Sequence, residues 1–67
     1  MKGGENMYEK ILELLEKNNE TSYQVSKKIG ISQTAFSNWK AGRSEPNVYN
    51  LKKLADYFGV SIEYFIN

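Results

Sequence analysis

The sequence predicts an all-α fold, a compact bundle of five short helices. Apolar residues recur at helical spacing along the chain, and no stretch alternates as a strand would. Ser, Thr or Asn precedes most of these apolar runs, where a helix N-cap is expected, and Gly follows several of them, where a helix ends. The chain has 67 residues, so we expect one domain, with a flexible N-terminal tail at 1–5 and a folded part at 6–67.

The first two predicted helices each begin at a capping box. Asn6 and Glu9 have the spacing of such a box, and so do Thr21 and Gln24. Gly30 ends the second helix, because glycine takes a positive φ without penalty. The inward apolar residues of these two helices are expected to be Met7, Ile11, Leu14, Leu15, Val25 and Ile29.

Three more helices are predicted in the second half of the chain. Ser32 caps the third helix, which Gly42 ends, and Asn47 caps the fourth, which Gly59 ends. Ser61 is expected to cap a short fifth helix. Tyr49, Tyr57 and Tyr64 are placed on exposed faces by these assignments. The predicted core comprises Ile11, Leu14, Leu15, Val25, Ile29, Ile31, Phe36, Trp39, Leu51, Leu54, Phe58, Ile62 and Phe65.

Composition argues against several classes of function. The chain has no Cys and no His, so it forms no disulfide and we expect no metal site and no cofactor. No apolar run approaches the roughly 18 residues of a membrane-spanning helix, and the N-terminal MKGGENMYEK lacks the apolar block of a signal peptide. We therefore expect a cytoplasmic protein. The chain also has no Gly-rich phosphate loop and no paired acids in a plausible cleft, so an enzyme is not expected.

Charge is distributed unevenly, although the formal net charge is only +1. Residues 21–44 hold Lys27, Lys28, Lys40 and Arg43 and no acidic residue, whereas the segments on both sides are net acidic. This pattern fits contact with a polyanion. It also fits a chance run of solvated lysines, and charge alone does not separate the two interpretations.

The strongest pattern lies around the predicted third helix. Only Gly30, Ile31 and Ser32 separate it from the second helix, and two helices joined by so short a turn with Gly are typical of a helix-turn-helix. In such a motif the second helix lies in the DNA major groove. One face of that helix carries neutral donors and acceptors, which suit base edges but also fit an ordinary polar surface: Gln33, Thr34, Ser37 and Asn38.

These residues resemble the lambda/434 repressor and Cro type of helix-turn-helix, the XRE family. The resemblance runs from 11 to 66 and rests on TSYQVSKKIGISQTAFSNWKAGRSEP followed by LKKLADYFGVSIEYFI. The positions that match the family pattern are Gln24, Gly30, Ile31, Ser32, Ser37, Trp39, Gly42, Pro46, Leu51, Leu54, Ala55, Gly59, Val60 and Ser61. The chain departs from the pattern at Ser26, which replaces the usual Ala, at Lys40, which replaces a frequent Glu, and at Ala41.

The resemblance implies roles for particular side chains. Base contacts are implied for Gln33, Thr34, Ser37 and Asn38. Phosphate contacts are implied near the start of the second helix and around the end of the third, at Ser22, Tyr23, Gln24, Lys40, Arg43, Ser44 and Asn47. Helix N-termini support this assignment, because their free N–H groups attract phosphate. A buried hydroxyl at Ser26 must be hydrogen-bonded or lie near the edge of the helix contact.

The resemblance also implies a function. We expect a bacterial or phage transcriptional regulator, a repressor that binds double-stranded DNA as a homodimer on an inverted-repeat operator. Tyr64 and Ile66 are the expected dimer contacts, because they have no obvious core partner. The alternative is an antitoxin-like protein-interaction module with the same fold. The chain ends where the family's DNA-binding domain ends, which also fits the N-terminal part of a longer regulator.

Overall fold

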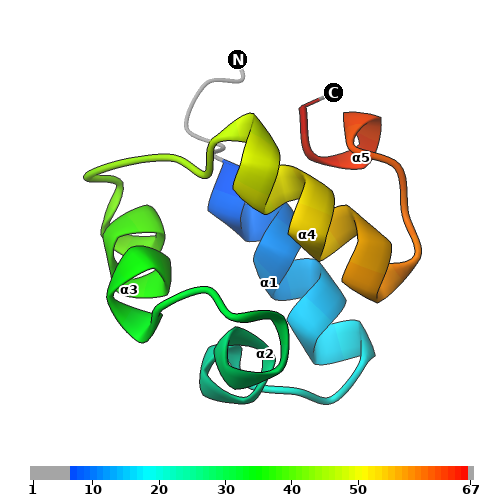
Figure 1. Ribbon diagram of the computed structural model, residues 1–67, viewed down its shortest axis with the longest axis horizontal. Coiled ribbons are helices and arrows are strands. Elements are labelled where there is room, and N and C mark those ends of the chain that lie inside the picture. The colour runs from blue at the N-terminus through cyan, green and yellow to red at the C-terminus, as the bar shows by residue number, and fades with distance from the viewer. Residues whose placement is uncertain (1–6, 67) are drawn as a thin grey trace.

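The fold is all-α, as the sequence predicts. The computed structural model describes residues 7–66, and this part of the chain forms five helices (Figure 1): α1 Met7–Lys17, α2 Ser22–Ile29, α3 Gln33–Ala41, α4 Val48–Phe58 and α5 Glu63–Ile66. The predicted tail at 1–5 and the predicted cap at Asn6 lie outside the described residues.

Side-chain caps begin α2, α3 and α4 at the predicted residues. In the capping box of α2, the Gln24 N–H donates to the Thr21 hydroxyl at 3.1 Å, and the Thr21 N–H donates to the Gln24 side-chain oxygen at 2.9 Å. Ser32 caps α3 and Asn47 caps α4, each through its side-chain oxygen. Each cap satisfies an N–H group that the first helical turn leaves without an intrahelical partner.

Gly30 and Gly42 end α2 and α3 in the left-handed conformation, with φ of 75° and 78°. The Gly30 N–H donates to the Ser26 carbonyl at 3.0 Å, and the Gly42 N–H donates to the Trp39 carbonyl at 3.1 Å. Glycine enters this conformation without the steric cost that a Cβ imposes. The two turns therefore set where both helices of the motif stop.

The hydrophobic core lies where the helices meet. Three predicted core residues, Ile29, Phe58 and Ile62, pack against the core but are only partly buried. Ile29 and Phe58 are the last residues of their helices, and Ile62 precedes α5, so each has neighbours on fewer sides. Ala55 is buried in addition to the predicted set. The buried residues that form the hydrophobic core are Ile11, Leu14, Leu15, Val25, Ile31, Phe36, Trp39, Leu51, Leu54, Ala55 and Phe65.

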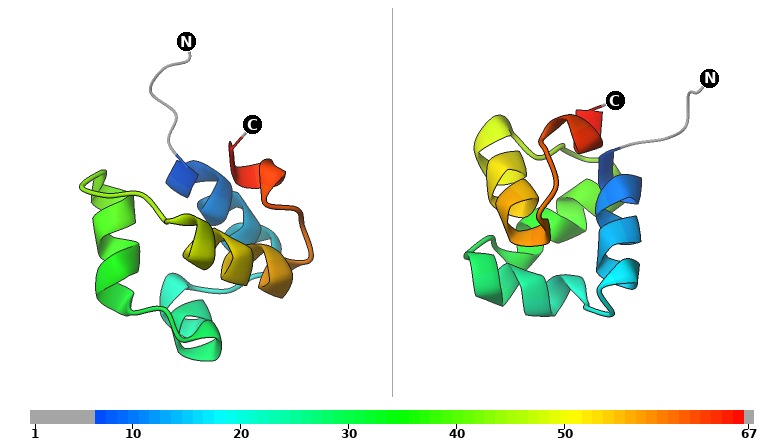
Figure 2. Two further views of the ribbon diagram at one scale, coloured as in Figure 1. Left: turned by 45° about the horizontal axis from the view of Figure 1, so that its top comes forward. Right: turned by 90° about the vertical axis from the view of Figure 1, so that its right-hand side faces the viewer.

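The short helix α5 packs against α1 (Figures 1 and 2). Phe65 is buried in this contact, and the Tyr64 hydroxyl donates to the Glu13 carboxylate at 3.2 Å. The prediction that Tyr64 is exposed without a core partner is therefore wrong: its ring is half-buried, with the Lys10 Nζ 5.8 Å from the ring centroid. At the turn before α5, the Tyr64 N–H donates to the Ser61 carbonyl at 3.1 Å. Ser61 therefore contributes to the start of α5 through its main-chain carbonyl.

Glu20 links the turn after α1 to both α2 and α4. Its carboxylate accepts hydrogen bonds from Lys28 Nζ at 2.8 Å and from the Tyr57 hydroxyl at 2.6 Å. Tyr57, predicted to be exposed, is consequently half-buried. The hydrogen bonds from Lys28 and Tyr57 hold the pKa of the Glu20 carboxyl below its ordinary value of 4.5.

Candidate nucleic-acid interface

Helices α2 and α3 form the predicted helix-turn-helix. They pack against each other and are joined by residues 30–32 alone. In Figure 1 and in the left view of Figure 2, α3 lies at the edge of the molecule, with α2 beside it. The side chains of Phe36 and Trp39 hold α3 to the core, with 1% and 4% of their surface exposed. The opposite side of α3 is therefore available to a partner.

That opposite side carries the four side chains predicted to contact bases, which we call the base face: Gln33, Thr34, Ser37 and Asn38. Gln33, Thr34 and Ser37 are exposed, and Asn38 is half-buried. Within residues 7–66, the side chains of Thr34 and Ser37 form no hydrogen bond, so both hydroxyls remain open to a partner. Gln33 and Asn38 differ, because each is held by a neighbouring residue.

Gln33 is held by two serines of α2. Its Nε2 donates to the Ser22 hydroxyl at 3.3 Å, and its Oε1 lies 3.4 Å from the Ser26 hydroxyl. Ser26 is buried, and its hydroxyl donates to the Tyr23 carbonyl at 2.8 Å, which meets the requirement that this departure from the family pattern be hydrogen-bonded. The sequence offered no signal for the contact with Gln33, which joins the two helices of the motif.

Asn38 is held by Arg43. The Arg43 Nε donates to the Asn38 Oδ1 at 2.9 Å, and the Arg43 main-chain N–H donates to the Asn38 carbonyl, also at 2.9 Å. The family resemblance implies a base contact for Asn38 and a phosphate contact for Arg43. The structure brings their side chains together at the C-terminal end of α3.

The phosphate contacts predicted on α2 lie at the start of that helix. Tyr23 is exposed, and its hydroxyl accepts from Lys27 Nζ at 3.2 Å. Gln24 is exposed, but its side-chain oxygen is used by the capping box. Ser22 is half-buried beside Gln33. This group, which we call the α2 phosphate set, surrounds N–H groups that the helix itself leaves unpaired.

The remaining predicted phosphate contacts run from the last turn of α3 to the cap of α4, and we call them the loop phosphate set: Lys40, Arg43, Ser44 and Asn47. All four residues are exposed. The Asn47 side-chain oxygen accepts from the Asn50 N–H at 2.8 Å and so begins α4. Each phosphate set therefore includes or adjoins the N-terminal end of a helix: the α2 phosphate set lies at the start of α2, and the loop phosphate set ends at the start of α4.

The charged side chains of α2 and α3 are all basic. Tertiary contacts change what each contributes, because Lys28 forms an ion pair with Glu20, and Lys27 Nζ lies 5.0 Å from the centroid of the Tyr23 ring. Lys40 forms no ion pair or hydrogen bond within residues 7–66. Lys40 is therefore the cation at the end of α3 most open to an anionic partner.

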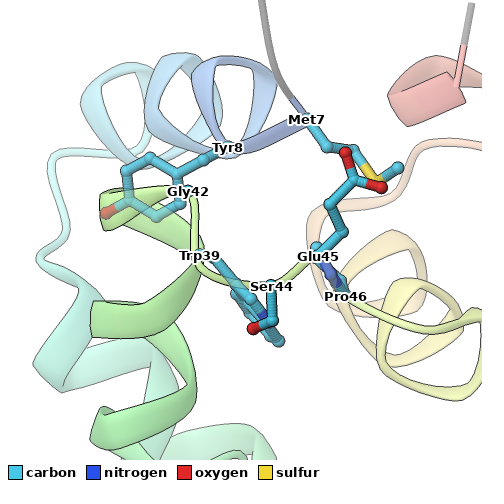
Figure 3. Close-up of a pocket in the computed structure, with 7 residues that line it drawn as sticks. All are labelled: Met7, Tyr8, Trp39, Gly42, Ser44, Glu45 and Pro46. Atoms are coloured by element: carbon cyan, nitrogen blue, oxygen red, sulfur yellow. The ribbon is translucent and has the colours of Figure 1, made fainter.

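A pocket of about 210 Å³ lies beside the loop phosphate set (Figure 3). Figure 3 shows Met7 and Tyr8 of α1 facing Trp39 and the loop that follows α3. Pockets that hold small-molecule ligands usually measure roughly 300–1,000 Å³, so this one is small for such a role. Burial raises the pKa of the Tyr8 hydroxyl. In residues 7–66, no cluster of three or more acidic, His or Cys side chains is arranged to hold a metal.

Comparison with known proteins agrees with this geometry. The family model described as helix-turn-helix matches residues 11–65, and the chain belongs to this family, the XRE-type DNA-binding transcriptional regulators. No solved structure matches the chain. Among the described residues, no helix has the length and apolar character needed to cross a membrane.

Three curated relatives are similar over most of the chain. The HTH-type transcriptional activator BcrR of Enterococcus faecalis is 34% identical over 55 residues, which cover 82% of this chain and 27% of BcrR. An uncharacterized HTH-type transcriptional regulator of Haemophilus influenzae is 35% identical over 60 residues, covering 90% of this chain and 25% of the relative. The cryptic phage CTXphi transcriptional repressor RstR of Vibrio cholerae is 38% identical over 45 residues, which cover 67% of this chain and 40% of RstR. The chain therefore spans about a quarter to two fifths of the length of these relatives.

Proposed function

We propose that the domain binds double-stranded DNA sequence-specifically, with α3 in the major groove and the base face toward the base edges. The observation that carries this proposal is the exposed, neutral face of α3 opposite the buried Phe36 and Trp39. A helix fits the major groove, where amides and hydroxyls can match the donor and acceptor pattern of each base pair. An acidic side chain on this face would be repelled by phosphate, and α3 has none.

The two phosphate sets would position α3 on the duplex. They lie on either side of the base face along the chain, one at the start of α2 and the other from the last turn of α3 to the cap of α4. Contacts to phosphate fix register and orientation but carry no direct sequence information. In this proposal α2 and the loop place the helix, and the base face selects the sequence.

A dimer on an inverted repeat completes the proposal. Two copies of a helix-turn-helix related by a two-fold axis place their recognition helices about 34 Å apart, one turn of DNA. The domain measures 33 × 23 × 23 Å, a size comparable to that spacing. Of the two predicted dimer residues, Tyr64 serves the contact between α5 and α1, whereas Ile66 is 56% exposed and remains the candidate.

We further propose that the protein acts as a repressor in the cytoplasm of a bacterium or phage host. Repression needs only that a bound protein block the promoter, whereas activation needs a second surface that contacts the transcription machinery. The relatives include a protein named as a repressor and one named as an activator. A promoter-reporter assay with the DNA site that the domain binds distinguishes repression from activation: reporter expression should fall when the protein is supplied.

Selection of bound DNA from a random pool tests the proposal. We expect an enriched inverted repeat with half-sites about 10 base pairs apart. Gln33→Ala should weaken binding to the selected site by about 1–3 kcal/mol and relax the preference at particular base pairs. Ser37→Ala should also weaken it, whereas the matched control Ser61→Ala, an exposed serine after α4, should not.

Two results would contradict the proposal. A pool without any enriched sequence would reject sequence-specific binding. Loss of binding to a protein partner on changing Ile66, with no effect of Gln33→Ala on any DNA, would favour the antitoxin-like interaction module instead. For the dimer, titration of a palindromic site should show a cooperative second binding step. A one-to-one complex that persists at protein excess would reject it.

A further inference from the structure

The contact between Asn38 and Arg43 bears on which base the domain selects. Arg43 is anchored twice to the same residue, by its main-chain N–H to the Asn38 carbonyl and by its Nε to the Asn38 Oδ1, both at 2.9 Å. Gly42, with φ of 78°, turns the chain so that Arg43 comes back over the end of α3. The arginine is exposed and the asparagine is half-buried.

This contact fixes the orientation of the Asn38 amide. A guanidinium only donates hydrogen bonds, so it pairs with the amide oxygen and never with the NH2 group. Rotation of the amide by half a turn would bring two donors together. Arg43 therefore holds the oxygen on its own side and leaves the NH2 group as the free end of Asn38.

An amide held in this way differs from a free one in the base edges that it can recognise by hydrogen bonds. A free Asn pairs with adenine through both groups, the oxygen accepting from N6 and the NH2 donating to N7. With one lone pair of the oxygen already taken by a cation and the amide fixed by that bond, the NH2 group is the unshared end that Asn38 offers. Guanine presents two acceptors, N7 and O6, on its major-groove edge, and it has no donor there that needs the amide oxygen.

We propose that Arg43 is a specificity-determining positioning residue that makes Asn38 select guanine over adenine. The inference rests on the proposed function, since it requires α3 to lie in the major groove. It changes the role of Arg43, which sequence analysis assigned only to phosphate. A pure phosphate contact would strengthen binding to every sequence equally, whereas a positioning residue changes the preference at one base pair.

The free protein provides a first test without DNA. In Asn38→Ala the Arg43 Nε–H loses its acceptor, so its resonance in a nitrogen–proton NMR spectrum should be lost through faster exchange with water. The parent should retain it. A resonance equally protected in both proteins would show that the Asn38 side chain does not hold Arg43, and it would overturn the proposal.

The second test measures base preference at the one base pair whose selection Asn38→Ala relaxes. The parent should favour guanine there. Arg43→Ala should shift the guanine-to-adenine affinity ratio by about tenfold toward adenine, the effect expected for one hydrogen-bonding contact. Arg43→Lys should give the same shift, because lysine keeps the charge but lacks the fixed geometry of the guanidinium. The matched control Lys40→Ala should weaken both sites equally.

The outcomes separate the two proposals. If Arg43→Ala and Arg43→Lys weaken guanine and adenine sites equally while the parent stays sequence-specific, the positioning role is rejected and the proposed function stands. If no base pair depends on Asn38, the positioning role is likewise rejected. If the parent selects no sequence at all, the proposed function fails and the inference fails with it.

Discussion

Removing the Phe36 ring should cost the domain about a third or more of its stability. Phe36 is 1% exposed, and its ring centroid lies 4.9 Å from that of Trp39, so Phe36→Ala removes a fully buried ring and half of an aromatic pair. Large-to-small changes of this kind cost about 3–5 kcal/mol, and the lost ring pair adds about 0.5–1.5 kcal/mol. At about 0.05–0.15 kcal/mol per residue, a chain of 67 residues has roughly 3–10 kcal/mol in total.

Urea unfolding followed by far-UV circular dichroism measures this loss. Phe36→Leu should cost less than Phe36→Ala, because it keeps a branched apolar side chain in the core. Val48→Ala is the control: Val48 is 71% exposed, and exposed positions usually change stability by less than about 0.5 kcal/mol. In the parent, the single Trp of the chain, Trp39, is 4% exposed and reports unfolding through its fluorescence. A Phe36→Ala protein that unfolds at the parent urea midpoint would refute the argument that Phe36 anchors α3.

Three further predictions concern binding, pH and a backbone turn. Lys40→Ala should lower the slope of log DNA affinity against log salt concentration by about one. The control Lys52→Ala, on α4, should leave the slope unchanged. An unchanged slope for both variants would remove Lys40 from the loop phosphate set. Hydrogen bonds hold the pKa of the Glu20 carboxyl below 4.5. The ionised carboxylate should therefore contribute its full stabilisation of the folded state above pH 4.5, and this contribution should be lost as the pH falls through the lowered pKa. Glu20→Gln should reduce this acid dependence in urea titrations, and an identical pH profile would contradict the role of the carboxylate. Gly30→Ala, at φ of 75°, should cost about 1–2 kcal/mol of unfolding free energy, and an unchanged midpoint would argue against the left-handed turn.

Local signals in the sequence predicted most of the fold correctly. The caps at Thr21, Ser32 and Asn47 and the stops at Gly30 and Gly42 all lie where the sequence places them. Each signal acts within one helical turn, through a side chain and a nearby N–H or through the φ of one residue. The helical period of the apolar residues then gave the buried side of each helix and, with it, the neutral face of α3.

The errors lie where contacts join distant parts of the chain or where a helix ends. Tyr57 and Tyr64 have exposed positions on a helix diagram, yet their hydroxyls donate to Glu20 and Glu13, which are 37 and 51 residues away along the chain. No local pattern encodes such pairs. The partial exposure of Phe58 depends similarly on how many neighbours surround the end of α4.

For the candidate interface, the sequence by itself determined which residue types lie on α3 and which side of the helix they occupy. Only the tertiary structure decided that Gln33 and Asn38 are held and that Thr34 and Ser37 are open. Whether a side-chain hydrogen bond forms depends on differences of a few tenths of an ångström in the donor–acceptor distance and on the direction of the donor. The turn at Gly42 and the packing of α2 against α3 set those distances, and residue spacing does not.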